Sequence, residues 1–209
     1  MQLRISQYLS SNLSNWNKKS PIALLLHGYG SNMRDLPGLM NFLPGMPWVS
    51  LQAPLDAGNG GFAWAPLRDP GNPSKEDLEP ATATIWDWID SNLPTNAPLV
   101  VIGFSQGGLM ATQLLRTRPS RIAATVILAG FVLGAKQPAD SDLAKSKPRV
   151  IYCRGLNDQV ISSDAVSRTE SWLARCTAAT IKTYDGLGHS IDERVMDDVS
   201  EYLESMLSR

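Results

Sequence analysis

The residues of this 209-residue chain best suited to chemistry are one serine between two glycines and two histidines. Ser105 lies in the motif GFSQGG, directly after the apolar run APLVVIGF, with Gly103 and Gly107 on either side. A serine hydroxyl is a weak nucleophile unless a neighbouring base removes its proton. His27 and His189 are the only histidines in the sequence. These residue types suit nucleophilic attack on a carbonyl carbon.

The surroundings of Ser105 predict a strand, a tight turn and a helix, which is the arrangement of a nucleophile elbow. A Cβ at Gly103 or Gly107 would collide across such a turn, so both glycines have a physical role. The helix that begins at Gln106 would direct its positive end at the reacting centre. The alternative is a serine that only caps this helix between two flexible glycines. The combination of strand, turn and helix favours the nucleophile.

The general base is expected to be His189, in the motif DGLGHS between the last apolar run and the last amphipathic stretch. Sheet hydrolases built on a nucleophile elbow run in the chain order serine, aspartate, histidine, and His189 fits that order. His27 follows the first apolar run, where a turn histidine commonly braces a loop by hydrogen bonding. We therefore interpret His27 as a structural residue. The alternative is that His27 is the general base.

The acid that orients the histidine should follow the strand between those of the serine and the histidine. Asp158, in RGLNDQV, has this position. Asp164 and Asp192 have simpler explanations, because each suits the beginning of a helix. Asp185 lies next to the histidine turn and is the second candidate. We predict that Asp158 is the acid.

Acyl transfer also needs two hydrogen-bond donors directed at the developing oxyanion. One is expected to be the backbone N–H of Gln106, the residue after the nucleophile. The other should come from the loop HGYGSN after the first strand, where Gly28 and Gly30 allow the chain to turn inward. We predict that the second donor is the N–H of Tyr29. The alternative is that this loop is an ordinary glycine turn without a role in catalysis.

Six short apolar runs alternate with longer amphipathic stretches along the chain. Near-continuous hydrophobicity in runs 97–105 and 123–131 indicates strands that are covered on both faces. The pattern predicts an α/β fold, a doubly wound and mainly parallel sheet with helices on both faces. Segment 1–9 alternates weakly and is a candidate antiparallel edge strand. The other expected strands are 21–28, 48–55, 97–105, 123–131, 149–155 and 180–186.

Three stretches show helical patterns, and two further stretches are expected to be loops. Residues 76–93 and 191–207 carry apolar side chains at spacings of three and four, and 107–115 is apolar nearly all round. Segments 56–75 and 133–148 are rich in Gly, Pro and Asp, and both are too short to form a cap domain. In an open sheet of this class, ligands bind beyond the carboxyl ends of the strands.

Composition limits the function classes. Hydrophobic residues make up 43% of the chain and charged residues 19%, and no linker or repeat divides it, so we expect one domain over 1–209. The net charge of −1 makes electrostatic capture of nucleic acid or an anionic membrane unexpected. No stretch reads as a signal peptide or a membrane span. Two cysteines are too few for a disulfide framework or a thiolate zinc site, which favours the cytoplasm.

The motifs together resemble the carboxylesterase/phospholipase and acyl-protein thioesterase branch of the α/β hydrolases. LLLHGYGSN is similar to the oxyanion loop of that family, GFSQGG to its elbow, GLND followed by Val160 to its acid turn, and GLGHS to its histidine turn. The resemblance spans nearly the whole chain and implies an α/β-hydrolase fold. We expect no cap domain, because the two loop segments are too short, and no metal or other cofactor. The roles that it carries over fall on Ser105, Asp158, His189, Tyr29 and Gln106.

The chain departs from the family around the expected substrate site. The family's loop usually carries an aromatic pair followed by Asp, whereas LQAPLDAGNGGFAWAPL has Phe62 and Trp64 without that Asp. Arg154 stands where a His often precedes the glycine of the acid turn. Five apolar residues at the expected catalytic end could line an acyl pocket or only pack locally. They are Phe62, Trp64, Phe131, Leu156 and Leu187.

We therefore expect a cofactor-free serine hydrolase that cleaves small esters or thioesters with short to medium acyl chains. One alternative is an acyl-protein thioesterase, which an acylated peptide compared with a small ester would distinguish. The alternative from another class is a binding protein that keeps the fold without turnover, and failure of a phosphonate to label the protein would favour it. The sequence carries no signal for an oligomeric state.

Overall fold

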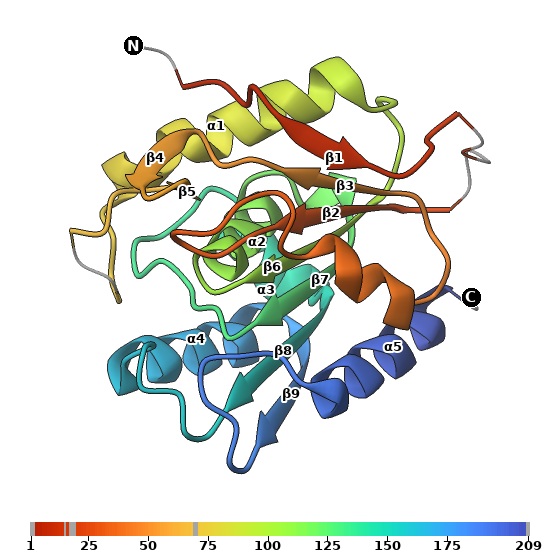
Figure 1. Ribbon diagram of the computed structural model, residues 1–209. Helices are drawn as coiled ribbons and strands as arrows, with labels where there is room; N and C mark the ends of the chain where they lie inside the picture. Colours follow the sequence, from red (N-terminus) through yellow and green to blue (C-terminus); the bar gives the residue numbers. More distant parts are fainter. Residues whose placement is uncertain (1–2, 15, 17–19, 69–70, 208–209) are drawn as a thin grey trace.

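The computed structural model describes residues 3–14, 16, 20–68 and 71–207, and within them a seven-stranded sheet forms the centre (Figure 1). The order across the sheet is β1-β3-β2-β6-β7-β8-β9, and every pairing is parallel except that of β1 with β3. The strands are β1 (Tyr8–Ser10), β2 (Ile22–Leu26), β3 (Trp48–Leu51), β6 (Leu99–Phe104), β7 (Ile122–Leu128), β8 (Arg149–Gly155) and β9 (Ala178–Tyr184).

Helices cover both faces of this sheet. Alternate side chains along each strand point to opposite faces, and in the central strands both sets are buried under helices. Leu24 and Val101 belong to the core under the helices α1 and α2, whereas Leu25 and Val100 belong to the core under α5. The helices are α1 (Lys75–Asn92), α2 (Gln106–Thr117), α3 (Asp140–Ser146), α4 (Ser163–Cys176) and α5 (Glu193–Leu207), with 3-10 turns η1 (Pro37–Phe42) and η2 (Pro119–Arg121). The predicted doubly wound α/β fold is confirmed.

The predicted antiparallel edge strand is present only in part: β1 pairs antiparallel with β3 but covers just residues 8 and 9 of the predicted segment 1–9, and residues 3–7 are not strand. Its first two predicted residues, 1 and 2, lie outside the described residues. Strand β3 ends at Leu51, four residues before the predicted end, and the chain then leaves the sheet. Among the described residues, every helix is too short or too polar for a transmembrane span.

Two segments that we expected to be loops contain regular structure. Segment 56–75 includes most of a hairpin of β4 (Leu55–Gly58) and β5 (Gly61–Ala63), joined by Asn59 and Gly60, which both have positive φ. An Asn-Gly pair readily adopts that conformation and is a strong hairpin signal, so this prediction was wrong. Segment 133–148 contains α3, whose first residue Asp140 accepts hydrogen bonds from the buried Arg116.

Candidate active site

Ser105 lies in a tight turn between β6 and α2, and its backbone has φ 54° and ψ −118°. The N–H of Ser105 donates to Leu128 O at 2.9 Å, which ties the turn to β7. A Cβ on Gly103 would lie 2.1 Å from Gly107 O, and a Cβ on Gly107 would lie 1.8 Å from Leu26 O. Glycine is therefore required at both positions for the elbow to close, as its spacing in the sequence indicates.

A chain of hydrogen bonds joins the serine, the second histidine and the aspartate after β8. His189 Nε2 lies 2.9 Å from Ser105 Oγ, and His189 Nδ1 lies 2.7 Å from Asp158 Oδ2. The other carboxylate oxygen of Asp158 accepts the N–H groups of Val160 at 2.8 Å and Ile161 at 3.1 Å. With both its oxygens accepting, the carboxylate holds the ring proton on Nδ1, which leaves Nε2 free to accept the serine proton.

The acid turn and the histidine turn approach each other through backbone hydrogen bonds. The N–H of Leu156 donates to Tyr184 O at 3.0 Å, and the N–H of Asn157 donates to Leu187 O at 2.9 Å. A Cβ on Gly155 would lie 2.1 Å from Leu187 O. Gly155 therefore permits the close approach that brings Asp158 to the histidine, a role that we did not predict.

The two predicted oxyanion donors border the same cavity as Ser105. Tyr29 follows β2 and Gln106 begins α2, and both line this cavity together with His189. Within the part of the chain that the structure describes, neither backbone N–H has a hydrogen-bond acceptor. Unpaired amides at a helix N-terminus and in an adjacent glycine turn can stabilise negative charge on a carbonyl oxygen.

His27 is fully buried and both of its ring nitrogens are occupied. Nδ1 donates to Gly28 O at 2.7 Å, and Nε2 accepts the N–H of Ala53 at 3.1 Å. Burial lowers the pKa of this imidazole despite the hydrogen bond to Gly28, which keeps the ring neutral. The structure thus agrees with the interpretation of His27 as a brace for the loop that carries Tyr29.

Trp64 does not line the cavity, and its predicted role in an acyl pocket was wrong. The side chain is fully buried, and its indole N–H donates to His27 O at 2.8 Å. The backbone N–H of Trp64 donates to the Gln106 side chain at 2.8 Å, and the Gln106 amide group donates in turn to Ala65 O at 2.8 Å. Trp64 therefore links the residue before the glycine turn to the residue after the nucleophile, and so braces the chain segments of both amide donors.

This brace leads to a prediction for Trp64→Phe, which keeps an aromatic ring and removes the indole N–H. We expect kcat for a small ester to fall by about tenfold or more with little change in KM, because small displacements of oxyanion donors are costly. Steady-state kinetics at several substrate concentrations measures both constants.

The matched control is Trp86→Phe. Trp86 is also buried, and its indole N–H also makes one hydrogen bond, to Thr117 Oγ1 at 2.9 Å. Thr117 is the last residue of α2, at the opposite end of that helix from Ser105. Both variants should lose similar stability, whereas only Trp64→Phe should lose kcat. Equal kinetic losses in the two variants would argue that Trp64 acts on stability alone.

The cavity over Ser105 has a volume of about 450 Å³ and is largely apolar. Of the five predicted pocket residues, only Phe131 lines it. Side chains that we did not predict as lining also contribute to its apolar wall. Among them are Leu67, Leu109 one helical turn after Ser105, and Val160 and Ile161 shortly after Asp158.

The other predicted pocket residues have different environments. Leu187 is buried in the core under α5, and Leu156 is 50% exposed outside the cavity. Phe62 packs against the core under α1, and its backbone pairs with Gly30 and Ser31 of the loop after β2. Phe62 therefore acts through its backbone, as support for that loop.

Metal ligands were not expected, and the described residues contain no group of three or more His, Cys, Asp or Glu side chains that could hold a metal ion. Cys153 and Cys176 are both buried and unpaired. Burial raises the pKa of the Cys153 thiol to about 12, so this thiol remains protonated at neutral pH.

Comparisons with known proteins agree with this architecture. The family model described as Phospholipase/Carboxylesterase matches residues 13–207. The acyl-protein thioesterase 1 of Kluyveromyces lactis is 28% identical over 214 residues, covering 89% of this chain and 92% of that protein. A Bacillus cereus carboxylesterase structure has a TM-score of 0.79 at 20% identity, covering 96% of this chain and 94% of the other. Esterase PE8 has a TM-score of 0.74 at 24% identity and covers 99% of this chain and 100% of its own.

Proposed function

The chain belongs to the phospholipase/carboxylesterase family, and from this membership we propose that it is a serine hydrolase that cleaves carboxylic esters or thioesters through an acyl-enzyme intermediate. The observation that carries the proposal is the hydrogen-bonded chain from Ser105 through His189 to Asp158, with links of 2.9 and 2.7 Å. Heavy-atom distances of this length allow proton transfer between serine and histidine.

The reaction begins when Ser105 Oγ attacks the carbonyl carbon and His189 Nε2 accepts the hydroxyl proton. The carbonyl oxygen becomes an oxyanion that receives the N–H groups of Tyr29 and Gln106. His189 then returns the proton to the departing alcohol or thiol, which leaves an acyl group on Ser105. A water molecule gives its proton to His189 and attacks the acyl carbon. His189 returns that proton to Ser105 Oγ as the bond between Oγ and the acyl carbon breaks, and the carboxylic acid departs. Asp158 holds His189 in position during both acylation and deacylation.

The acyl chain is proposed to occupy the apolar cavity beside Ser105, which favours short to medium chains. Each methylene that becomes buried contributes up to about 0.8 kcal/mol, or roughly fourfold in kcat/KM. The rate should rise with acyl length and level off once the volume of about 450 Å³ is filled. The substrate is a small molecule, and nucleic acid and membrane insertion are not part of the proposal.

Leu67→Ala tests where the acyl chain lies. Leu67 lines the cavity and is 50% exposed, so its replacement should flatten the rise of kcat/KM with chain length without unfolding the protein. Leu156 is also 50% exposed but lies outside the cavity, which makes Leu156→Ala a matched control. A series of p-nitrophenyl esters from acetate to decanoate measures the profile. An unchanged profile in Leu67→Ala, or equal flattening in both variants, would place the acyl chain elsewhere.

A second candidate is an acyl-protein thioesterase. Relatives with that name in Kluyveromyces lactis and Debaryomyces hansenii, 28% and 22% identical, favour it. The measurement that separates the two candidates compares an S-acylated peptide with a small thioester of the same acyl chain. A much higher kcat/KM for the peptide would favour the thioesterase, whereas equal values would favour a hydrolase of small substrates.

A cytoplasmic location is also part of the proposal. It is supported by the two cysteines, which are both unpaired and buried.

A further inference from the structure

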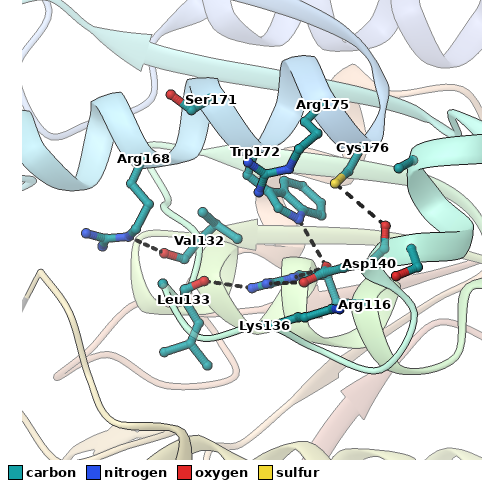
Figure 2. A pocket seen from close by; sticks show the side chains of 13 residues that line it. Arg116, Val132, Leu133, Lys136, Asp140, Arg168, Ser171, Trp172, Arg175 and Cys176 are labelled. Atoms are coloured by element: carbon teal, nitrogen blue, oxygen red, sulfur yellow. Dashed lines mark hydrogen bonds and ion pairs between the residues drawn. The ribbon is translucent and has the colours of Figure 1, made fainter.

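A second cavity of about 440 Å³ lies between α3, α4 and the segment that follows β7, and it shares no lining residue with the cavity over Ser105 (Figure 2). Figure 2 shows Arg168, Ser171, Trp172 and Arg175 carried by α4 along one side, with Lys136 on the facing side. This volume is in the range of small-molecule sites in proteins. Nothing in the proposed reaction uses this cavity.

The floor of the cavity is a buried ion pair that is fully hydrogen-bonded. Arg116 is 2% exposed, and its Nε and Nη2 each donate to one carboxylate oxygen of Asp140 at 2.8 Å. Trp172 Nε1 also donates to Asp140, at 3.1 Å. Burial alone would raise the pKa of Asp140, but these hydrogen bonds and that of the Gln137 amide outweigh it and lower the pKa. The pair stays charged and neutralises itself, so neither member is available to hold a ligand.

The same pair fixes the position of Lys136. Arg116 Nη2 donates to Ala135 O at 3.0 Å, and the N–H of Gln137 donates to Asp140 Oδ2 at 2.8 Å. Both neighbours of Lys136 in the chain are therefore anchored, although the lysine itself is exposed. A cation on an anchored backbone loses less conformational entropy on binding than one on a mobile loop.

The lining of the cavity has a strong excess of positive charge. Arg116, Lys136, Arg168 and Arg175 face the single carboxylate of Asp140, in a chain whose net charge is −1. Arg168 donates to Val132 O at 3.0 Å, whereas among the described residues the side chains of Lys136 and Arg175 make no hydrogen bond or ion pair. Two such cations facing one cavity attract an acidic group.

We propose that this cavity binds a small organic acid, with its carboxylate or phosphate between Lys136 and Arg175. The planar guanidinium of Arg175 can hold two oxygens of either group, and Lys136 adds a second charge from the facing wall. The volume of about 440 Å³ exceeds the needs of a bare phosphate, since one water molecule occupies only about 30 Å³ of liquid. The remaining space accommodates the organic part of the ligand.

The test uses the full-length protein with benzoate, phenyl phosphate, inorganic phosphate and neutral benzyl alcohol as probes. Affinity is measured by calorimetry, and the site by the indole ¹H–¹⁵N resonance of Trp172, assigned with Trp172→Phe. We expect benzoate or phenyl phosphate to bind and to shift this resonance, and the tighter of the two identifies the acid. Inorganic phosphate and benzyl alcohol should each bind at least tenfold more weakly than the tighter of these two acids.

The decisive comparison is between two double variants that remove the same charge. Lys136→Ala with Arg175→Ala should weaken binding at least tenfold, and both side chains are exposed, so folding is preserved. Lys75→Ala with Lys145→Ala removes two cations outside the cavity, one partly exposed and one exposed, and should leave binding unchanged.

Equal affinity in these two variants, no shift of the Trp172 resonance, or binding of benzyl alcohol as tight as that of benzoate would overturn the proposal. Inorganic phosphate as tight as phenyl phosphate would reduce the site to a bare anion contact and overturn it too. None of these readouts depends on hydrolysis, so they remain valid if the proposed hydrolase activity fails.

Discussion

Ser105→Ala is expected to lower kcat for a p-nitrophenyl ester by at least about 10³-fold while leaving the fold intact. Without Oγ, no acyl-enzyme can form, and only the oxyanion donors and substrate binding remain to accelerate the reaction. The backbone at position 105 has φ 54°, which alanine and serine adopt at similar cost, so the elbow should keep its shape. Circular dichroism and thermal unfolding check the fold, and initial rates check the activity.

Ser190→Ala is a suitable control for this variant. Ser190 is exposed and next to His189 in the chain, and among the described residues its hydroxyl makes no hydrogen bond. Its loss should leave kcat near the wild-type value. A fluorophosphonate should label wild type and Ser190→Ala at Ser105 and should leave Ser105→Ala unlabelled, as mapped by mass spectrometry.

Near-wild-type hydrolysis by Ser105→Ala would remove this serine from the mechanism. Absence of both turnover and labelling in the wild-type protein would instead favour a binding protein that keeps the fold of a hydrolase.

Asp158→Asn is expected to lower kcat by about 10³- to 10⁴-fold. The N–H groups of Val160 and Ile161 both donate to one oxygen of Asp158, and the asparagine carbonyl would stay with these donors. The NH₂ group would then face His189 Nδ1, which now lies 2.7 Å from a carboxylate oxygen. A donor there forces the ring proton onto Nε2, so His189 could no longer accept the proton of Ser105.

Asp185→Asn makes the same chemical change in the neighbouring turn and is the matched control. Asp185 is exposed, and among the described residues its side chain makes no hydrogen bond; its backbone C=O accepts from Arg194 at 3.2 Å. We therefore expect kcat to stay within about twofold of wild type. The two variants are compared under the same conditions in single-substrate kinetics. A larger loss in Asp185→Asn than in Asp158→Asn would move the acid to Asp185.

Much of the fold could be predicted because the signals for it are local. Apolar runs such as 97–105 and 123–131 are buried on both faces, so their composition alone indicates central strands of a parallel sheet. The single domain over 1–209 stays a prediction. The hairpin turn at Asn59 and Gly60 was also readable from the sequence, and we overlooked it because the surrounding segment is rich in loop-forming residues.

The residues of the candidate site could be predicted from the sequence for a related reason. In a parallel sheet, the residues that follow successive strands meet at one edge, so Ser105, Asp158 and His189 could be grouped from chain order before any contact was known. The glycines around Ser105 were informative because the elbow tolerates no side chain there. The sequence by itself therefore determined the type of fold and the proposed catalytic group.

Only the tertiary structure decided which side chains line the cavity and which support it. The partners of Trp64 lie 37 and 42 residues away in the chain, and those of Arg116 lie up to 24 residues away. Position in a loop does not say whether an aromatic ring faces a cavity or the core, because that depends on how the hairpin, the sheet and α2 pack together. Burial and hydrogen bonding between distant segments assign such residues, and no local spacing encodes them.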